Sequence, residues 1–354
     1  MSSLSNAAVG VFCFVSAAPS CRSPAGGEKF PSSERRRYGK PIAGFHKVAV
    51  VGAGSVGTAV AYASMIGRVT DQIALYDVDG PRARAEVLDL RHGLQFVGGG
   101  QVDGGDDVAV CAGADLVVVT AGSTHGPGQT RMALAATNSR LVRTVLPPLL
   151  DVAPDAVVLL VTNPVDVVTY VAQEHTGLPA GRVLGSGTVL DSSRLRHALA
   201  ERLGIAVGSV HATVVGEHGD SEIVLWSSAT VGGTPVLDVV GPTGGRIAAD
   251  ELDTLRLEVR NAGNEIIAGK GHTNLAIGLA TARIVRAIAR DERAVLPVSV
   301  RADVDGIGDV CLSLPSVVGR QGVLSRLDVP MDEEERAGLR ASAAAIREVI
   351  DTVS

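Results

Sequence analysis

Three residues have the side-chain types and spacing of a site that binds an organic acid and moves a proton. His218 lies in the polar segment GEHGDSE, after a stretch typical of a strand, so we expect its ring in a cleft, although isolated histidines are usually structural. A hydrogen bond from Asp191, in another segment expected at the crevice, would fix the tautomer and stabilise the imidazolium. Arg194 follows Asp191 by about one helical turn, and its planar guanidinium would suit a substrate carboxylate.

A fourth candidate, Arg131, ends the Gly/Pro-rich loop STHGPGQTR. Either its charge is simply solvated, or loop closure delivers it to a substrate carbonyl. Spacing alone does not choose between these two interpretations.

The segment 47–79 predicts a nucleotide-binding cradle. An apolar run, Val48 to Val51, leads into Gly52, Gly54 and Gly57, which fit the pattern G-x-G-x-x-G. The first glycine allows a tight turn, the second lets the backbone approach a pyrophosphate, and the third lets helix pack on strand. The helix expected from about Ser55 would direct its free N–H groups and positive dipole end at the phosphates.

An acidic residue at the end of the next expected strand indicates which dinucleotide binds. The run from Ile73 to Tyr76 ends in Asp77, twenty residues after Gly57. A carboxylate there accepts hydrogen bonds from the ribose 2′-OH and repels a 2′-phosphate, which favours NAD over NADP. An ordinary glycine-rich turn is the alternative, but strand, glycines, helix, strand and acid occur in the order that dinucleotide binding requires.

The elements that must position these residues alternate between strand and helix in the first half of the chain. Leu116 to Val119 predicts a strand that ends at Thr120 and Gly122, and Val157 to Val161 predicts one that ends at Asn163. Ligands bind at the carboxyl ends of such strands. After the GEHGDSE segment the alternation changes to short antiparallel strands, two helices, a strand meander and a final amphipathic helix.

We therefore predict an α/β protein with an N-terminal Rossmann doubly wound parallel sheet and a C-terminal α+β substrate domain. The expected divisions are a disordered N-terminal extension (1–46), an NAD-binding domain (47–187) and a substrate domain (188–354). In more detail, we expect a helix at 81–94, two strands within 106–119, a strand at 207–215, helices at 251–267 and 273–289, and a strand meander at 295–328.

Composition argues against several other classes of protein. The 354 residues are 46% hydrophobic, enough for two sizeable cores, and their net charge of −6 comes without the basic stripe that nucleic-acid binding needs. The longest apolar run near the N-terminus, Ala7 to Ala18, is too short to span a membrane. The four cysteines are better explained as reduced thiols than as a metal site or a disulfide framework (Cys13, Cys21, Cys111, Cys311).

Residues 1–46 differ from the rest because they are rich in Ser, Pro and Gly and carry the basic cluster Arg35, Arg36 and Arg37. Three interpretations stay open: an organellar targeting peptide, an arm that contacts other subunits, or translated sequence upstream of the true start. We favour a dispensable tail over targeting and expect a cytoplasmic protein.

Four motifs together resemble the L-lactate/malate dehydrogenase family, nearest to its bacterial lactate dehydrogenase branch. They are AGSTHGPGQTR (121–131), TNPVD (162–166), GSGTVLDSSRLR (185–196) and GEHGDSE (216–222), and the likeness extends over residues 47–352. The resemblance implies an NAD-dependent enzyme of glycolysis or fermentation, active as a homotetramer. Its reaction would pass a hydride reversibly between a 2-hydroxy acid and nicotinamide C4.

The same resemblance implies a role for each matching residue. His218 would be the acid/base, Asp191 its partner, Arg194 the carboxylate clamp and Arg131 the group that polarises the carbonyl. Asn163 would contact substrate and cofactor, and Thr273 would line the substrate pocket. The cofactor would be bound by nine positions: Gly52, Gly54, Val56, Gly57, Asp77, Thr120, Gly122, Asn138 and Asn163.

His125 departs from the family pattern at the position that contacts the C3 substituent of the substrate. Lactate dehydrogenases typically have glutamine there and malate dehydrogenases arginine. A neutral imidazole would accept the methyl group of pyruvate, whereas an imidazolium would attract the second carboxylate of oxaloacetate, and a free histidine of pKa about 6.5 allows both. The alternative is that His125 points to solvent and has no role in specificity.

Further expectations concern regulation and competing functions. Arg196 and His211 match positions that bind fructose 1,6-bisphosphate in regulated bacterial lactate dehydrogenases, but unregulated members carry such residues too. The leading function is an L-lactate dehydrogenase, and the alternative is a malate or broader L-2-hydroxyacid dehydrogenase. An NAD-dependent glycosidase would need a Cys and His metal pair at the crevice, and the full set of catalytic residues argues against an inactive NAD-binding paralogue.

Overall fold

The structure, a computed structural model, describes residues 45–123, 130–304 and 306–353. Residues 47–105 form a βαβαβ unit in which three parallel strands pair in the spatial order β3-β2-β1. Asp79 caps the second helix by accepting a hydrogen bond from the Arg82 amide at 3.2 Å. The elements are β1 (Lys47–Val51), α1 (Ser55–Ile66), β2 (Gln72–Tyr76), α2 (Gly80–Gly93) and β3 (Gln101–Gly105).

A second unit adds three parallel strands on the other side of β1, in the order β4-β5-β6. The order therefore reverses between β1 and β4, which creates the switch point where doubly wound sheets bind their ligands. The elements are β4 (Leu116–Val119), α3 (Arg131–Val152), β5 (Val157–Leu160), α4 (Val165–Thr176) and β6 (Val183–Gly185).

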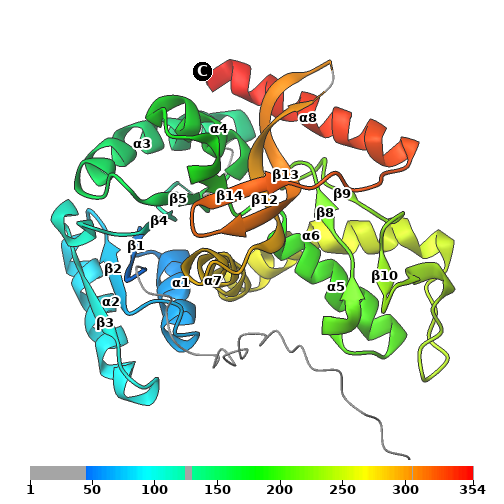
Figure 1. The fold of residues 1–354 in the computed structure, drawn as a ribbon, viewed down its shortest axis with the longest axis horizontal. Coiled ribbons are helices and arrows are strands. Elements are labelled where there is room, and N and C mark those ends of the chain that lie inside the picture. Colours follow the sequence, from blue (N-terminus) through cyan, green and yellow to red (C-terminus); the bar gives the residue numbers. More distant parts are fainter. Residues whose placement is uncertain (1–44, 124–129, 305, 354) are drawn as a thin grey trace, which may run out of the picture. The chain divides into compact units, whose positions relative to one another are not determined.

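Helices cover both faces of this sheet, which explains why its strands are short runs of Val and Leu. Alternate residues of β1 enter different cores: Val48 and Val50 pack with residues of α1, α2 and α7 (Leu275–Ala289), while Ala49 and Val51 pack with residues of α3 and α4. Figure 1 shows α7 beside α1, which it contacts extensively. The predicted Rossmann fold is thus confirmed.

The predicted strand meander extends the same sheet. β12 (Ala294–Val304), β13 (Gly308–Gly319) and β14 (Gly322–Arg326) pair antiparallel, and β12 joins the parallel part where Ser299 pairs with Gly185 of β6. The resulting nine-stranded order is β14-β13-β12-β6-β5-β4-β1-β2-β3. Ser299 therefore lies where the antiparallel part of the sheet meets the parallel part, next to the strand that leads into the predicted catalytic segment.

The remaining C-terminal elements lie outside the nine-stranded sheet and form two smaller sheets and three helices, α5, α6 and α8. Two small antiparallel sheets have the orders β11-β10-β7 and β8-β9, and α8 packs on α3, α4 and β13. The elements are α5 (Val189–Leu203), β7 (Val210–His211), β8 (Val214–Val215), β9 (Ile223–Val224), β10 (Thr230–Val231), β11 (Thr234–Pro235), α6 (Leu252–Lys270) and α8 (Glu333–Val353).

Two details of the predicted elements are wrong. The segment 106–119 contains one strand rather than two, because Asp107 accepts a hydrogen bond from the Ala109 amide at 2.9 Å and starts a 3-10 helix at Val108–Cys111. The segment 207–215 is not one strand: β7 and β8 are separate two-residue strands that pair in different sheets. Within the described residues, no helix has the length and apolarity needed to cross a membrane.

Candidate functional site

The glycine turn after β1 has the shape of a dinucleotide cradle. Gly52 has φ +103°, and a Cβ on Gly57 would lie 1.8 Å from the Gly52 carbonyl oxygen, so only glycine fits at either position. A Cβ on Gly54 would meet no atom within 4 Å. The N-terminus of α1 therefore faces open space that a pyrophosphate would fill, and Val56 packs in its first turn against the core below.

Asp77 is fixed beside this turn. Its Oδ2 accepts a hydrogen bond from the Ala53 amide at 2.6 Å, and its Oδ1 accepts one from the Asp79 amide at 2.9 Å. A carboxylate has further acceptor sites for two ribose hydroxyls. These residues fit NAD, as the sequence predicts.

Asn138 joins the two crevice loops that follow β4 and β5. Its fully buried carboxamide donates to the carbonyl oxygens of Asn163 (2.7 Å) and Ser123 (3.1 Å) and accepts from the Ser123 amide (2.8 Å). Thr120 donates to the Val51 carbonyl oxygen at 3.0 Å, which fixes the end of β4 to that of β1. In this arrangement Asn138 organises the crevice while the side chain of Asn163 stays exposed.

Gly122 lies where the loop after β4 packs closely against the loop after β5. A Cβ on Gly122 would lie 2.4 Å from Cγ2 of Thr162. Thr162 in turn donates a hydrogen bond to the Ala121 carbonyl oxygen at 2.7 Å. A larger residue at position 122 would push the two loops apart.

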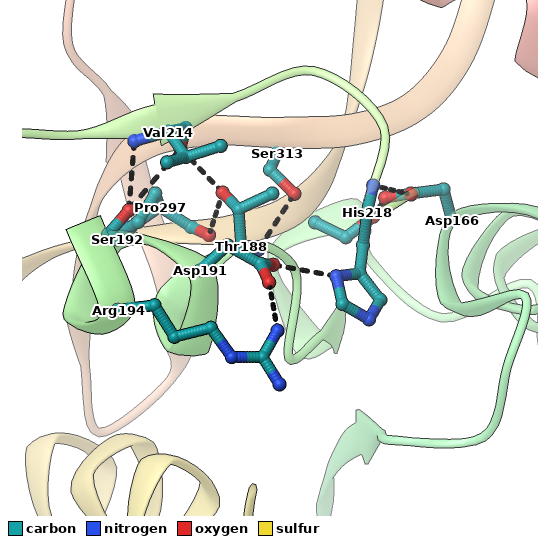
Figure 2. A network of polar contacts seen from close by, with 10 residues as sticks. Asp166, Thr188, Asp191, Ser192, Arg194, Val214, His218, Pro297 and Ser313 are labelled. Carbon is teal, nitrogen blue, oxygen red and sulfur yellow. Dashed lines mark hydrogen bonds and ion pairs between the residues drawn. The ribbon is translucent and has the colours of Figure 1, made fainter. Parts of the chain in front are cut away.

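The predicted catalytic pair forms between α5 and the loop after β8. Nδ1 of His218 lies 2.6 Å from Oδ2 of Asp191, and Arg194 Nη1 lies 2.8 Å from Oδ1 of the same carboxylate (Figure 2). The Asp191 side chain is only 2% exposed, whereas that of His218 is 27% exposed. One buried carboxylate thus orients both the proposed acid/base and the proposed substrate clamp.

The start of α5 is anchored so that Asp191 is placed in its first turn. Thr188 Oγ1 donates to the Val214 carbonyl oxygen at 2.5 Å, and the Val214 amide donates to Ser192 Oγ at 2.9 Å (Figure 2). The Thr188 amide also donates to Ser313 Oγ on β13 at 3.1 Å. Helix α5, strand β8 and the extended sheet are therefore locked together immediately behind the His218 loop.

Electrostatics favour a charged pair. The negative charge of Asp191 outweighs burial and raises the pKa of His218 to about 9. Burial opposes ionisation of Asp191, but the charges and hydrogen bonds of His218 and Arg194 prevail and hold the pKa of Asp191 below its ordinary value. Because Asp191 uses Nδ1, Nε2 of His218 is the nitrogen left to exchange a proton with a substrate oxygen.

Two acidic residues next to the pair were not predicted from the sequence as part of the site. Asp166 Oδ2 accepts a hydrogen bond from the His218 backbone amide at 2.8 Å. Glu222 is 5% exposed, and burial, followed by the charge of Asp191, raises the pKa of Glu222 to about 8. The sequence could have indicated their involvement only through their positions in the TNPVD and GEHGDSE motifs.

Three other residues predicted to contact the substrate are described only in part or not at all. Arg131 is the first residue of α3, whose N-cap Thr130 accepts a hydrogen bond from the Ala133 amide at 3.1 Å; its side chain and all of His125 lie outside the described residues. Thr273 is half-buried in the turn between α6 and α7. Their substrate roles stay predictions.

Two residues, Arg196 and His211, are predicted to bind a sugar bisphosphate. Arg196 Nε donates to the Ala212 carbonyl oxygen at 2.8 Å, which brings its side chain next to the strand of the exposed His211. In the part of the chain that the structure describes, no three His, Cys, Asp or Glu side chains gather to hold a metal ion.

Comparisons with known proteins agree with this geometry. A family model described as the NAD-binding domain of lactate/malate dehydrogenase matches residues 46–185, and the model for the alpha/beta C-terminal domain of that family matches residues 188–354. The chain is 45% identical over 304 residues to an L-lactate dehydrogenase of Bifidobacterium animalis subsp. lactis, covering 85% of this chain and 95% of the relative. It is 46% identical over 309 residues to one of Synechococcus sp., covering 87% and 99%.

Among solved structures, the minor L-lactate dehydrogenase of Enterococcus mundtii in a ligand-bound form superposes with a TM-score of 0.83 at 38% identity. The match covers 88% of this chain and 99% of that protein. Both domains, the glycine cradle and the His218–Asp191 pair thus lead to one assignment. The chain belongs to the lactate/malate dehydrogenase family and is an NAD-dependent oxidoreductase.

Proposed function

We propose that the protein is an L-lactate dehydrogenase that interconverts (S)-lactate and pyruvate. The observation that carries the proposal is the shared Asp191 carboxylate, which holds Arg194 and His218 2.8 Å and 2.6 Å from its two oxygens. A 2-oxoacid presents a carboxylate and a carbonyl oxygen on neighbouring carbons, so one small acid reaches both groups. The relatives named L-lactate dehydrogenase support this choice.

In the proposed reaction, Arg194 binds the substrate carboxylate and His218 donates its Nε2 proton to the carbonyl oxygen as that oxygen gains negative charge. NADH, when bound, supplies the hydride to the carbonyl carbon. Arg131 stabilises the developing alkoxide. A His218 with a pKa of about 9 is protonated at neutral pH and so is ready to act as the acid in pyruvate reduction.

His125 supports a second candidate, a malate or broader L-2-hydroxyacid dehydrogenase. The test is NADH oxidation by the full chain with pyruvate and with oxaloacetate from pH 5.5 to 8. Pyruvate preference at every pH supports the lactate assignment, and oxaloacetate preference favours the malate assignment. If His125 reads the C3 substituent, the oxaloacetate-to-pyruvate ratio rises toward pH 6 in the wild type and stays flat in His125→Gln.

The finer assignments are proposals of the same kind. We propose a homotetramer; exposed apolar side chains on the adjacent helices α1 (Tyr62, Ile66) and α7 (Leu275, Leu279) support contact between subunits. Fructose 1,6-bisphosphate is the proposed activator, bound through Arg196 and His211. We also propose a cytoplasmic enzyme of fermentation or glycolysis whose NAD-binding and substrate domains meet at residues 187 and 188, close to the matched boundaries.

A further inference from the structure

A second buried carboxylate, Asp166, holds the catalytic loop through its backbone. Asp166 is 2% exposed and lies in the first turn of α4. Its Oδ2 accepts the hydrogen bond from the His218 amide at 2.8 Å, and its Oδ1 accepts one from the hydroxyl of Ser299 at 2.6 Å. Figure 2 shows the Asp166 carboxylate next to the backbone nitrogen of His218, on the side away from Asp191.

These contacts connect three parts of the fold. Asp166 follows Asn163 by three residues in the crevice segment, Ser299 lies on β12 where that strand meets β6, and His218 lies on the loop after β8. Asn163 is in turn held through its carbonyl oxygen by Asn138. Asp166 therefore connects the loop that carries the proposed proton donor to the segment expected to contact substrate and nicotinamide.

The position suits a charged carboxylate rather than a neutral spacer. Hydrogen bonds to ionised groups are shorter and stronger than those between neutral groups, and the positive end of α4 favours an anion in its first turn. An apolar residue at position 166 would leave the His218 amide and the fully buried Ser299 hydroxyl without this acceptor. These two donors offset part of the cost of burying the charge.

We propose that Asp166 is a positioning residue for the reduction of 2-oxoacids: it fixes the backbone of His218 so that the imidazole meets Asp191 and the substrate carbonyl together, and its charge stabilises the imidazolium. The proposal rests on the proposed function, because it assigns a task in that reaction. It differs from the role of Asp191, which binds the ring itself.

The charged groups around His218 predict the direction of the effect on its acidity. Asp191 acts from α5, Asp166 from α4 and Glu222 from the same loop as His218, and all three raise the pKa of His218. Arg194 on α5 and Arg260 on α6 face Asp191 and Glu222 with opposite charge. Loss of the Asp166 charge alone should therefore lower the pKa of His218 while the Asp191 pair stays in place.

Two substitutions separate geometry from charge. In Asp166→Asn the amide oxygen still accepts from the His218 amide and the NH₂ group donates to the Ser299 oxygen, so both contacts survive without the charge. In Asp166→Ala both contacts are lost. Ser299→Ala removes one donor to the carboxylate and leaves the His218 contact, which provides a test that does not alter Asp166.

A matched control exists at the other end of the chain. Glu335 is also buried and also accepts from a backbone amide and a hydroxyl, those of Ser227, at 2.8 Å and 2.5 Å. Glu335→Gln removes a buried charge of the same kind outside the catalytic machinery. It should reduce thermal stability without changing kcat or the pH profile.

The experiment measures kcat and KM for pyruvate in the full-length protein at saturating NADH from pH 6 to 10, alongside the melting temperature of each variant. Asp166→Asn should move the alkaline limb of kcat/KM to lower pH by about 0.5 to 1 unit. Asp166→Ala should lower kcat at least tenfold with KM changed less than threefold, and Ser299→Ala should lower kcat less than Asp166→Ala does.

The proposal is overturned if Asp166→Asn keeps the wild-type pH profile, or if Asp166→Ala loses activity only in proportion to its folded fraction, as Glu335→Gln would. If both Asp166 variants fail to fold, Ser299→Ala decides: reduced kcat at wild-type KM supports the role, and unchanged kcat overturns it. Failure of the proposed function looks different, because the wild type itself would then not reduce pyruvate.

Discussion

Arg194 Nη1 lies 2.8 Å from Oδ1 of Asp191, one turn earlier on the same helix. The remaining oxygen of Asp191 binds the imidazole of His218, so the two functional groups are not independent of each other. A link of this kind fixes the separation between the two groups that, in the proposed reaction, would meet the carboxylate and the carbonyl of one substrate.

Removing the charge of Asp191 should therefore harm both catalysis and binding. In Asp191→Asn the amide favours the wrong tautomer of His218 and no longer neutralises Arg194. We expect kcat to fall by about 10³ to 10⁴, as for the equivalent change in a Ser-His-Asp triad, and KM for pyruvate to rise as well. Steady-state kinetics at saturating NADH measure both; an unchanged KM would contradict the shared orientation of Arg194.

Arg194→Lys should affect binding more than the chemical step. An ammonium cannot keep one planar hydrogen bond to Asp191 and also present a fork to the substrate. We expect KM for pyruvate to rise about 10- to 100-fold, the equivalent of losing one hydrogen bond to a charged group. The pH profile should stay that of the wild type, because Asp191 still binds His218; a displaced profile would show that Arg194 also sets the acidity of the ring.

The raised pKa of His218 predicts a dependence of stability on pH. The folded-state pKa of about 9 exceeds the unfolded value of about 6.5, so the folded state binds the proton more tightly. This stabilisation, of up to about 3 kcal/mol, is fully present below pH 6.5 and is lost as pH rises through 9. Urea unfolding at fixed protein concentration from pH 6 to 10 measures it.

The control for that series is His218→Gln, which should lose less stability than the wild type over the same range. Glu222→Gln is a second control, because the pKa of Glu222 is also raised, to about 8, and its stabilising proton is lost within the same window. The Glu222 variant should keep the loss near pH 9. Equal slopes in the wild type and His218→Gln would contradict the assignment.

The sequence predicts contacts between side chains better than contacts made through the backbone. The residue types of His218, Asp191 and Arg194 indicate their chemistry. The spacing of the glycines before an expected helix indicates a phosphate site at the N-terminus of that helix. Asp166 accepts a hydrogen bond from the backbone amide of His218. Nearly every residue has such an amide, so the residue type at position 218 could not indicate this contact.

The burial of Glu222 and the strand pairing of segment 207–215 could not be predicted from the neighbouring sequence either. Nothing near Glu222 in the sequence indicates that it is 5% exposed next to another carboxylate, because that carboxylate, Asp191, comes from α5. The expected strand at 207–215 divides into β7 and β8 because each half finds a different partner, β10 and β9, later in the chain. The β-propensity of the segment predicts strand, but pairing with distant strands determines where each strand begins and ends.

The contrast between Gly54 and Gly57 gives a test of the cofactor site that does not depend on turnover. A Cβ on Gly57 would overlap the Gly52 carbonyl oxygen at 1.8 Å, whereas a Cβ on Gly54 would meet nothing within 4 Å. The φ of Gly54 is −76°, which alanine adopts without strain. Gly54→Ala should therefore fold with a melting temperature close to that of the wild type.

Its methyl group would nevertheless occupy the space where we place the pyrophosphate. We expect the Kd for NADH, measured by fluorescence or calorimetry, to rise at least tenfold in Gly54→Ala, about 1.4 kcal/mol. Gly57→Ala should lose both stability and binding, and Gly208→Ala, another position where a Cβ meets nothing, should lose neither. NADH affinity unchanged in Gly54→Ala would mean that the phosphates approach α1 from another direction.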